Sequence, residues 1–174
     1  MNKRPIQLLV VAVFAAGLVL GLGACKGKTL GQRLGEKSVE NMIEKATGGQ
    51  AKVDLKEGTI KVKTAEGETE IGSSRTWPND FPIEVPKPAT GKVEGVVRSN
   101  QGDKKYWNIT IKEAEAGTFD KYQEALKAQG WEIKMATTTP DGGILNAQKD
   151  KLAVVATWAE KGTTINITVT NQLD

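Results

Sequence analysis

The chain of 174 residues contains no histidine and only one cysteine, Cys25. Histidine is the commonest general base near neutral pH and the commonest metal ligand, so its absence removes the usual routes to catalysis and to metal binding. A single cysteine also excludes an internal disulfide. The basic residues form no stripe interleaved with aromatics, which gives nucleic acid little to bind. We therefore expect no cofactor, no metal and no nucleic-acid partner.

The segment before Cys25 has the order of a bacterial export signal. Lys3 and Arg4 form a basic tip, and residues 6–24 carry no charge. The most apolar part, residues 8–22, is shorter than the roughly 20 residues that span a bilayer comfortably. The pattern predicts a cleaved signal peptide, and a retained membrane helix is the alternative. Loss of Lys3 and Arg4 would leave 22 basic residues against 21 acidic ones.

The four residues Leu22, Gly23, Ala24 and Cys25 resemble the lipobox of bacterial lipoproteins. The resemblance implies a signal peptide over residues 1–24, cleavage between Ala24 and Cys25, and lipid such as palmitate on the Cys25 thiol. It also implies export and anchoring to a membrane of the cell envelope. In a bacterium with two membranes, Lys26 after the cysteine implies the periplasmic face of the outer membrane. In a bacterium with one, it implies the outer face of the cell membrane.

The next two segments are expected to be a tether and a small unit. Residues 25–35 are rich in glycine and predict a lipidated flexible tether, whose cations either meet anionic lipids or are simply solvated. Over residues 36–73 a helical period is followed by a period of two, which predicts a short helix and a three-stranded β-meander. The helix has Ser38 as N-cap, its apolar residues are Val39, Met42, Ile43 and Ala46, and Gly48 and Gly49 end it. We expect it to cover the meander; binding a partner or a membrane is the alternative.

Residues 74–90 hold four of the six prolines. Proline at this density excludes helix and regular strand pairing, so we expect an extended, polyproline-like connector. Trp77 and Phe81 within it are possible contacts for a partner, and packing against the protein itself is the alternative.

Residues 91–174 have the patterns of a ββαββββ domain. Their apolar residues alternate in six strands, and one helix begins at the predicted N-cap Thr118 and ends at Gly130. The expected fold class is α+β: a small helix and β-meander unit, a connector, and a two-layer sandwich of one helix on an antiparallel sheet. The alternation places Trp107, Trp131 and Trp158 in the core.

The second face of that sheet is expected to be polar. Asn166, Thr168 and Lys134 lie on it beside smaller apolar residues such as Val155, so it is either solvated or a binding surface. The triplets 108–110 and 166–168 both spell Asn-Ile-Thr, which matches the N-glycosylation pattern. In a bacterial chain we interpret them as ordinary strand residues. Most of the mature chain, with its helix ending at Gly48 and Gly49, its charged meander and its proline segment, resembles small exported bacterial lipoproteins of unknown function, and that resemblance implies no catalytic residues.

The sequence favours binding over catalysis. No serine lies in a nucleophile motif, and Glu113, Glu115 and Asp120 are the nearest approach to a two-carboxylate site. We expect a membrane-anchored, non-catalytic binding or accessory module, whose partner is an envelope protein or a cell-wall polymer. The alternatives are an envelope enzyme that uses carboxylates or lysine, and a structural spacer.

Overall fold

The computed structural model describes residues 40–41, 44–45, 49–56, 59–72, 74–159 and 163–171. The chain divides into two compact units, residues 1–52 and 53–174. In the first unit, Glu40, Asn41, Glu44 and Lys45 are helical, and the amide of Gly49 donates to the carbonyl of Glu44 at 2.7 Å. The signal segment, the tether and the apolar residues of the expected helix lie outside the described residues. No helix in the described part is long and apolar enough to cross a membrane.

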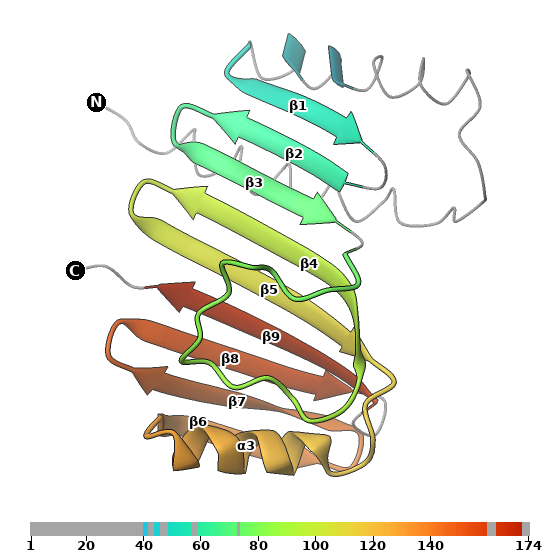
Figure 1. Cartoon of the computed structure of the whole chain (residues 1–174), viewed down its shortest axis with the longest axis vertical. Helices are drawn as coiled ribbons and strands as arrows, with labels where there is room; N and C mark the ends of the chain where they lie inside the picture. Colours follow the sequence, from blue (N-terminus) through green and yellow to red (C-terminus); the bar gives the residue numbers. More distant parts are fainter. Residues whose placement is uncertain are drawn as a thin grey trace. The chain divides into compact units, whose positions relative to one another are not determined.

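The described strands form one antiparallel sheet of nine strands, in the order β1-β2-β3-β4-β5-β9-β8-β7-β6 (Figure 1). The strands are β1 (Ala51–Lys56), β2 (Thr59–Thr64), β3 (Gly67–Gly72), β4 (Lys92–Gln101), β5 (Lys104–Lys112), β6 (Glu132–Thr139), β7 (Gly142–Lys149), β8 (Leu152–Ala159) and β9 (Thr164–Asn171). The helix α3 (Thr118–Ala128) stands between β5 and β6 in the chain. It carries the chain from the middle of the sheet to its edge, and β6 to β9 return from that edge until β9 pairs with β5.

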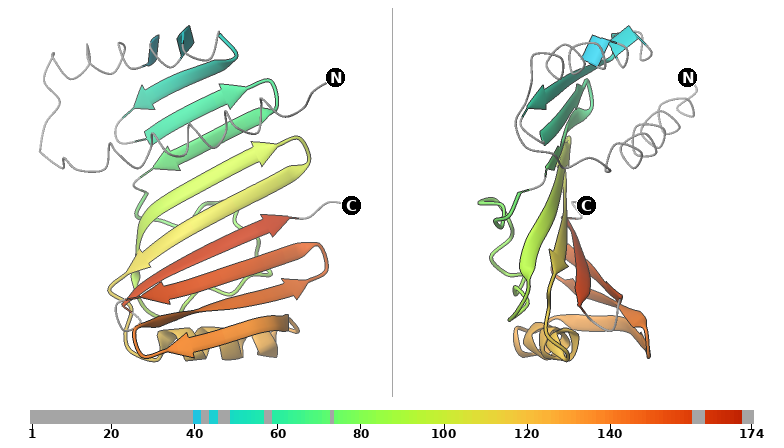
Figure 2. Two further views of the ribbon diagram at one scale, coloured as in Figure 1. Left: turned by 180° about the vertical axis from the view of Figure 1, so that it is seen from behind. Right: turned by 90° about the vertical axis from the view of Figure 1, so that its right-hand side faces the viewer.

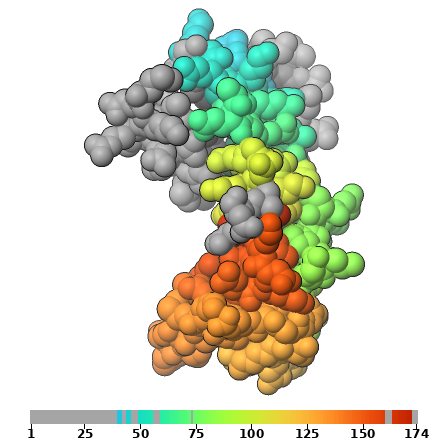
Figure 3. Space-filling model, turned by 90° about the vertical axis from the view of Figure 1, so that its left-hand side faces the viewer, coloured from blue at the N-terminus to red at the C-terminus, as the bar shows by residue number. Residues whose placement is uncertain are grey.

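The hydrophobic core lies on one face of this sheet. Both α3 and the connector, residues 74–90, lie against that face (Figures 1 and 2). Figure 3 shows the connector, in green, standing out from the sheet on the side where α3 lies. Trp107, Trp131 and Trp158 are buried there, as their alternation predicts. Among the described residues, those that are 0% exposed are Ile109, Leu126, Leu145, Val154, Ala156, Ile165, Ile167 and Val169.

The ends of α3 are set by glycines. Gly117 occupies the N-cap position with φ of 78°, and no side chain caps the helix. The prediction that Thr118 is the N-cap is therefore wrong: Thr118 is the first helical residue, and its buried hydroxyl hydrogen-bonds the hydroxyl of Thr90 at 2.5 Å. At the other end Gly130 has φ of 80°, a left-handed conformation that favours glycine after a helix.

The expected fold class, an α+β sandwich of ββαββββ type with a separate meander unit, is wrong. The protein is β-rich, because β3 continues directly into the main sheet. Residues 67–72 of β3 pair antiparallel with residues 96–101 of β4, so the meander and the later strands share one ladder of hydrogen bonds. The helix α3 covers only part of one face of these nine strands. The sequence pattern missed this because strands β3 and β4 are separated by the whole connector.

The connector is not extended throughout. The amide of Phe81 donates to the carbonyl of Pro78, and the amide of Val85 donates to the carbonyl of Pro82, both at 3.1 Å. These two turns fold the segment back over the sheet. Val85 is buried in the core, and the indole nitrogen of Trp131 donates to the carbonyl of Glu84 at 3.0 Å. The connector is therefore fixed to the sheet at several points.

Candidate functional site

A cleft of about 370 Å³ lies between the start of the connector and strands β2, β3 and β4. Its volume falls within the range of roughly 300 to 1,000 Å³ that is typical of small-molecule sites. Hydroxyl and amide side chains line it together with one indole and one ion pair. The lining residues are Thr59, Glu70, Gly72, Ser74, Thr76, Trp77, Pro78, Asn79, Val96 and Arg98.

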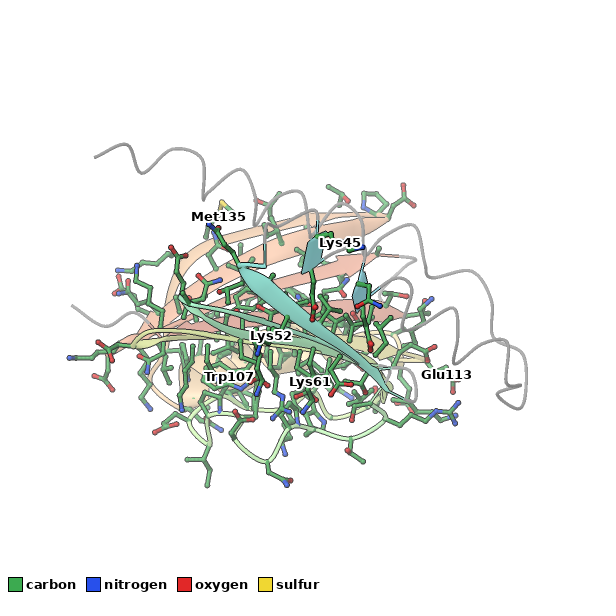
Figure 4. The ribbon with its side chains drawn as sticks, turned by 90° about the horizontal axis from the view of Figure 1, so that it is seen from above. Lys45, Lys52, Lys61, Trp107, Glu113 and Met135 are labelled. Atoms are coloured by element: carbon green, nitrogen blue, oxygen red, sulfur yellow. The ribbon has the colours of Figure 1, made fainter. Side chains whose placement is uncertain are left out.

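Strand register builds the floor of the cleft. Thr59 pairs with Gly72, and Gly72 with Val96, so these residues point to one face of the sheet. Gly72 leaves space at the centre of this row, since a Cβ there would lie 3.2 Å from the hydroxyl oxygen of Thr59. The row of Lys61, Glu70, Arg98 and Trp107 runs beside it. Figure 4 shows Lys61 and Trp107 on the same side of the sheet.

Charged groups on the floor balance one another. Arg98 contacts Glu70 at 2.8 Å and Asp80 of the connector at 3.3 Å, and Lys61 contacts Glu70 at 3.2 Å. Burial lowers the pKa of Arg98, but the negative charge of Glu70 and the hydrogen bond to Asp80 outweigh it, so the pKa is raised overall. Arg98 is therefore a permanent cation held between two carboxylates. Of these four groups only Glu70 and Arg98 line the cleft, and their charges cancel.

The connector residues proposed as partner contacts, Trp77 and Phe81, lie together beside the cleft. Their ring centroids are 4.9 Å apart in an edge-on arrangement, and Phe81 meets Trp107 in the same way at 6.4 Å. Both side chains are half-buried against the core. The ammonium group of Lys87 lies 5.2 Å from the Trp77 ring centroid, within cation–π range. Trp77 lines the cleft, whereas Phe81 does not line it and contacts it only through the Trp77 ring.

The other predicted site residues lie elsewhere. Ala24 and Cys25 are outside the described residues, so cleavage and lipidation stay predictions. The carboxylate of Glu113 is exposed and forms an ion pair with Lys92, and Asp120 lies in the first turn of α3. Neither these two residues nor Glu115 lines the cleft. Within the described ranges, no group of three or more cysteine, aspartate or glutamate side chains is placed to hold a metal ion.

Sequence reasoning missed Glu70, Asp80 and Arg98. One signal was available: with Val96 and Arg98 two residues apart on a strand, the arginine points to the same face as a buried valine. A charge at an inward position indicates a partner or a site. The sequence does not identify that partner, because Asp80 comes close to Arg98 only when the connector folds over the sheet.

Comparison with known proteins gives one partial match. A family model described as START domain-like matches residues 112–171, about a third of the chain, from the end of β5 through α3 to β9. The residues that line the cleft lie outside this match. No curated protein and no solved structure matches the chain.

Proposed function

We propose that this chain is a non-catalytic binding module of the bacterial cell envelope, anchored to a membrane by lipid on Cys25, with the cleft beside Trp77 as its binding site. The observation that carries the binding role is the cleft itself: a hollow of about 370 Å³ whose side chains are held in place on a rigid sheet and a fixed connector. Sites on fixed elements keep their geometry for a ligand. The START domain-like match also supports a ligand-binding role.

The cleft chemistry favours a polar ligand with little net charge. Thr59, Ser74 and Thr76 offer hydroxyl groups, and Asn79 offers a carboxamide. Arg98 and Glu70 already neutralise each other, so a strongly charged ligand would have to displace one of them. Trp77 adds an apolar ring, which suits a ligand with both polar and apolar surface. A segment of a cell-wall polymer or of an envelope protein meets these conditions.

The binding role is tested by pull-down with isolated cell wall and with envelope extract, using the soluble form that begins at Lys26. We expect Trp77→Ala to weaken capture by about tenfold or more, because truncation of a central aromatic contact commonly costs over 1 kcal/mol. The control is Ile83→Ala, since Ile83 is 93% exposed on the same connector and does not line the cleft. Equal capture of both variants and the wild type would show that the cleft is not the binding site.

The anchoring role is tested separately by mass spectrometry of the protein taken from membranes. We expect a chain that begins at Cys25 and carries the added mass of acyl groups on that residue. Two or more acyl chains give stable anchoring, whereas one gives only marginal binding. A chain that retains Met1 to Ala24, or an unmodified Cys25, would contradict the proposed anchor. It would have no bearing on binding at the cleft.

A further inference from the structure

One edge of the sheet is open within the described part of the chain. The strand β6 is last in the strand order and pairs with β7 alone, so one row of its backbone N–H and C=O groups meets no other strand. The residues from Met135 to Thr139 are all exposed, and Met135 is 41% exposed. We call residues 135–139 the open edge.

The helix α3 does not cover the open edge. Ala136 pairs with Leu145, which is 0% exposed, and Thr138 pairs with Gly143. Gly143 lies beside the indole of Trp158. Ala136 and Thr138 are therefore on the core side of β6, yet both are exposed. The right-hand view of Figure 2 shows the reason, because the far end of the β6–β7 hairpin, in orange, stands away from α3. The open edge is accessible from both faces of the sheet.

The two halves of β6 differ in their protection against pairing with another strand. The first half carries the ion pair of Glu132 and Lys134, and its register shifts at a bulge between Ile133 and Met135. Charges and bulges are the usual features that keep edge strands from pairing with other strands. The open edge has neither: its sequence, Met-Ala-Thr-Thr-Thr, carries no charge and no proline, and threonine favours strands. This half of β6 is suited to accept another strand.

We propose that the open edge pairs antiparallel with the open edge of a second copy of this chain, with Thr137 opposite Thr137 on a two-fold axis. This register sets Met135 opposite Thr139, and Ala136 opposite Thr138. Residues directly opposite in an antiparallel pair point to the same face. The register meets this requirement, because positions 135, 137 and 139 lie on one face of β6 and positions 136 and 138 on the other. A two-fold interface uses the same patch on both copies.

Charge favours a second copy over an unrelated strand. Because the five residues of the open edge pair only with one another, no charge is set against this uncharged row. The same register places Lys134 of one copy beside the turn residue Asp141 of the other, and both residues are exposed. The two-fold axis makes this contact twice. Exposed ion pairs add little affinity, but they favour one register. An unrelated strand would have to match both the uncharged row and the lysine beside it.

Disulfide trapping tests the register. Cys25 is the only cysteine, so the full-length chain is made with Cys25→Ser, purified in a neutral detergent and treated with oxidised glutathione. Thr137→Cys should link the two copies, because opposite Cα atoms lie about 4.5 to 5.5 Å apart and a disulfide spans about 4.4 to 6.8 Å. The matched control is Thr139→Cys, which is exposed on the same face, although its two copies would lie about 13 Å apart along the strands. We expect about tenfold more linked dimer from Thr137→Cys.

Sedimentation equilibrium of the full-length chain in the same detergent, under reducing conditions, tests the affinity. Five paired residues make a small interface, so we expect a weak dimer with a Kd on the order of 10 to 100 µM. Thr137→Lys sets two like charges opposite each other on the axis and should weaken the dimer about tenfold or more, while circular dichroism stays unchanged. The control is Asn100→Lys, at an exposed position on β4. Trp77→Ala, which tests the cleft, should leave the dimer intact, because the cleft is built from β2 to β4 and the connector.

Equal linking of Thr137→Cys and Thr139→Cys would overturn the proposal. Equal dimerisation of Thr137→Lys and Asn100→Lys would do the same. A wild type that stays monomeric up to about 1 mM would also contradict it, and would leave the open edge to a strand of another protein.

Discussion

At the scale of single residues, Arg98 is the connection between the sheet and the connector. Its guanidinium contacts Glu70 on β3 and Asp80 on the connector, and its side chain is 35% exposed. We expect Arg98→Gln to lower the free energy of unfolding by about 0.5 to 1 kcal/mol, because solvent screens an ion pair this exposed. Urea denaturation measures the effect, and the difference from wild type should shrink as salt is added.

The control for Arg98 is a double-mutant cycle with Asp80→Asn. If the pair joins sheet and connector, the two substitutions together should cost less than the sum of their separate costs. Lys61 would still neutralise Glu70 in every variant, so the measured loss of stability should come mainly from the contact between Arg98 and Asp80. Strict additivity would show that the contact between Arg98 and Asp80 contributes nothing to stability.

Removal of the Tyr122 hydroxyl should not reduce the stability of the fold. Its hydroxyl is buried and has no hydrogen-bond partner in the described part of the chain, and burial raises the pKa of its phenol well above the usual value. Tyr122→Phe should therefore leave the free energy of unfolding at pH 7 unchanged or raise it by up to about 1 kcal/mol. If Tyr122→Phe instead lowered the free energy of unfolding by more than about 1 kcal/mol, the hydroxyl would have to be hydrogen-bonded in solution.

The same residue predicts a pH dependence. The folded state holds the Tyr122 proton more tightly than the unfolded state, whose tyrosines ionise near pH 10. This contribution is fully present below about pH 10 and is lost as the pH rises above it, because only the unfolded chain then releases the proton. Denaturation from pH 9 to 11 should show a smaller loss of stability for Tyr122→Phe than for wild type. An equal alkaline loss of stability in Tyr122→Phe and in wild type would contradict this prediction.

At the scale of elements, the packing of Trp158 between β7 and α3 depends on Gly143. Gly143 lies opposite Trp158 in the ladder, and a Cβ at this position would overlap the indole of Trp158, which stacks on Phe119 of α3. We expect Gly143→Ala to lower the free energy of unfolding by about 2 to 3 kcal/mol, since the indole and the nearby backbone carbonyl of Thr137 would both have to move. Thermal denaturation followed by near-ultraviolet circular dichroism reports both changes.

A suitable control for Gly143 is Gly95→Ala in β4. There a Cβ would meet only ordinary contacts, the nearest being Thr110 at 3.9 Å, and the backbone is not left-handed. This variant should cost no more than a few tenths of a kcal/mol. Similar losses for the two glycines would show that general strand propensity, and not the indole of Trp158, sets the requirement.

The sequence predicted the individual strands and α3, but it did not predict which strands pair with each other. The alternation of Trp107, Ile109 and Ile111 predicted a strand with one buried face, and all three are buried. Pairing of β3 with β4 was not readable, because a two-residue period fixes which face a residue takes but not which strand lies beside it. The cleft depends on that pairing and on the turns of the connector, so its residues could not be assembled in advance.

At the scale of the whole molecule, the continuity of the sheet predicts that β3 contributes to the stability of strands far along the chain. All four tryptophans, at positions 77, 107, 131 and 158, lie outside β1 to β3. Ile71 on β3 is half-buried and pairs with Val97 of β4 on one side and Ile60 of β2 on the other. Ile71→Ala removes packing from this row and should cost about 1 to 2 kcal/mol, less than a fully buried isoleucine would.

If the strands unfold as one cooperative sheet, tryptophan fluorescence must report that loss, although three of the four tryptophans, at positions 107, 131 and 158, lie on or after β5. The urea midpoint by fluorescence should fall, and it should coincide with the midpoint by far-ultraviolet circular dichroism. Ile83→Ala is the matched control, because it removes the same atoms from a residue that is 93% exposed, and it should leave the midpoint in place. A fluorescence midpoint that Ile71→Ala does not shift would mean that β1 to β3 melt independently, and that the ladder between β3 and β4 does not couple them to the core.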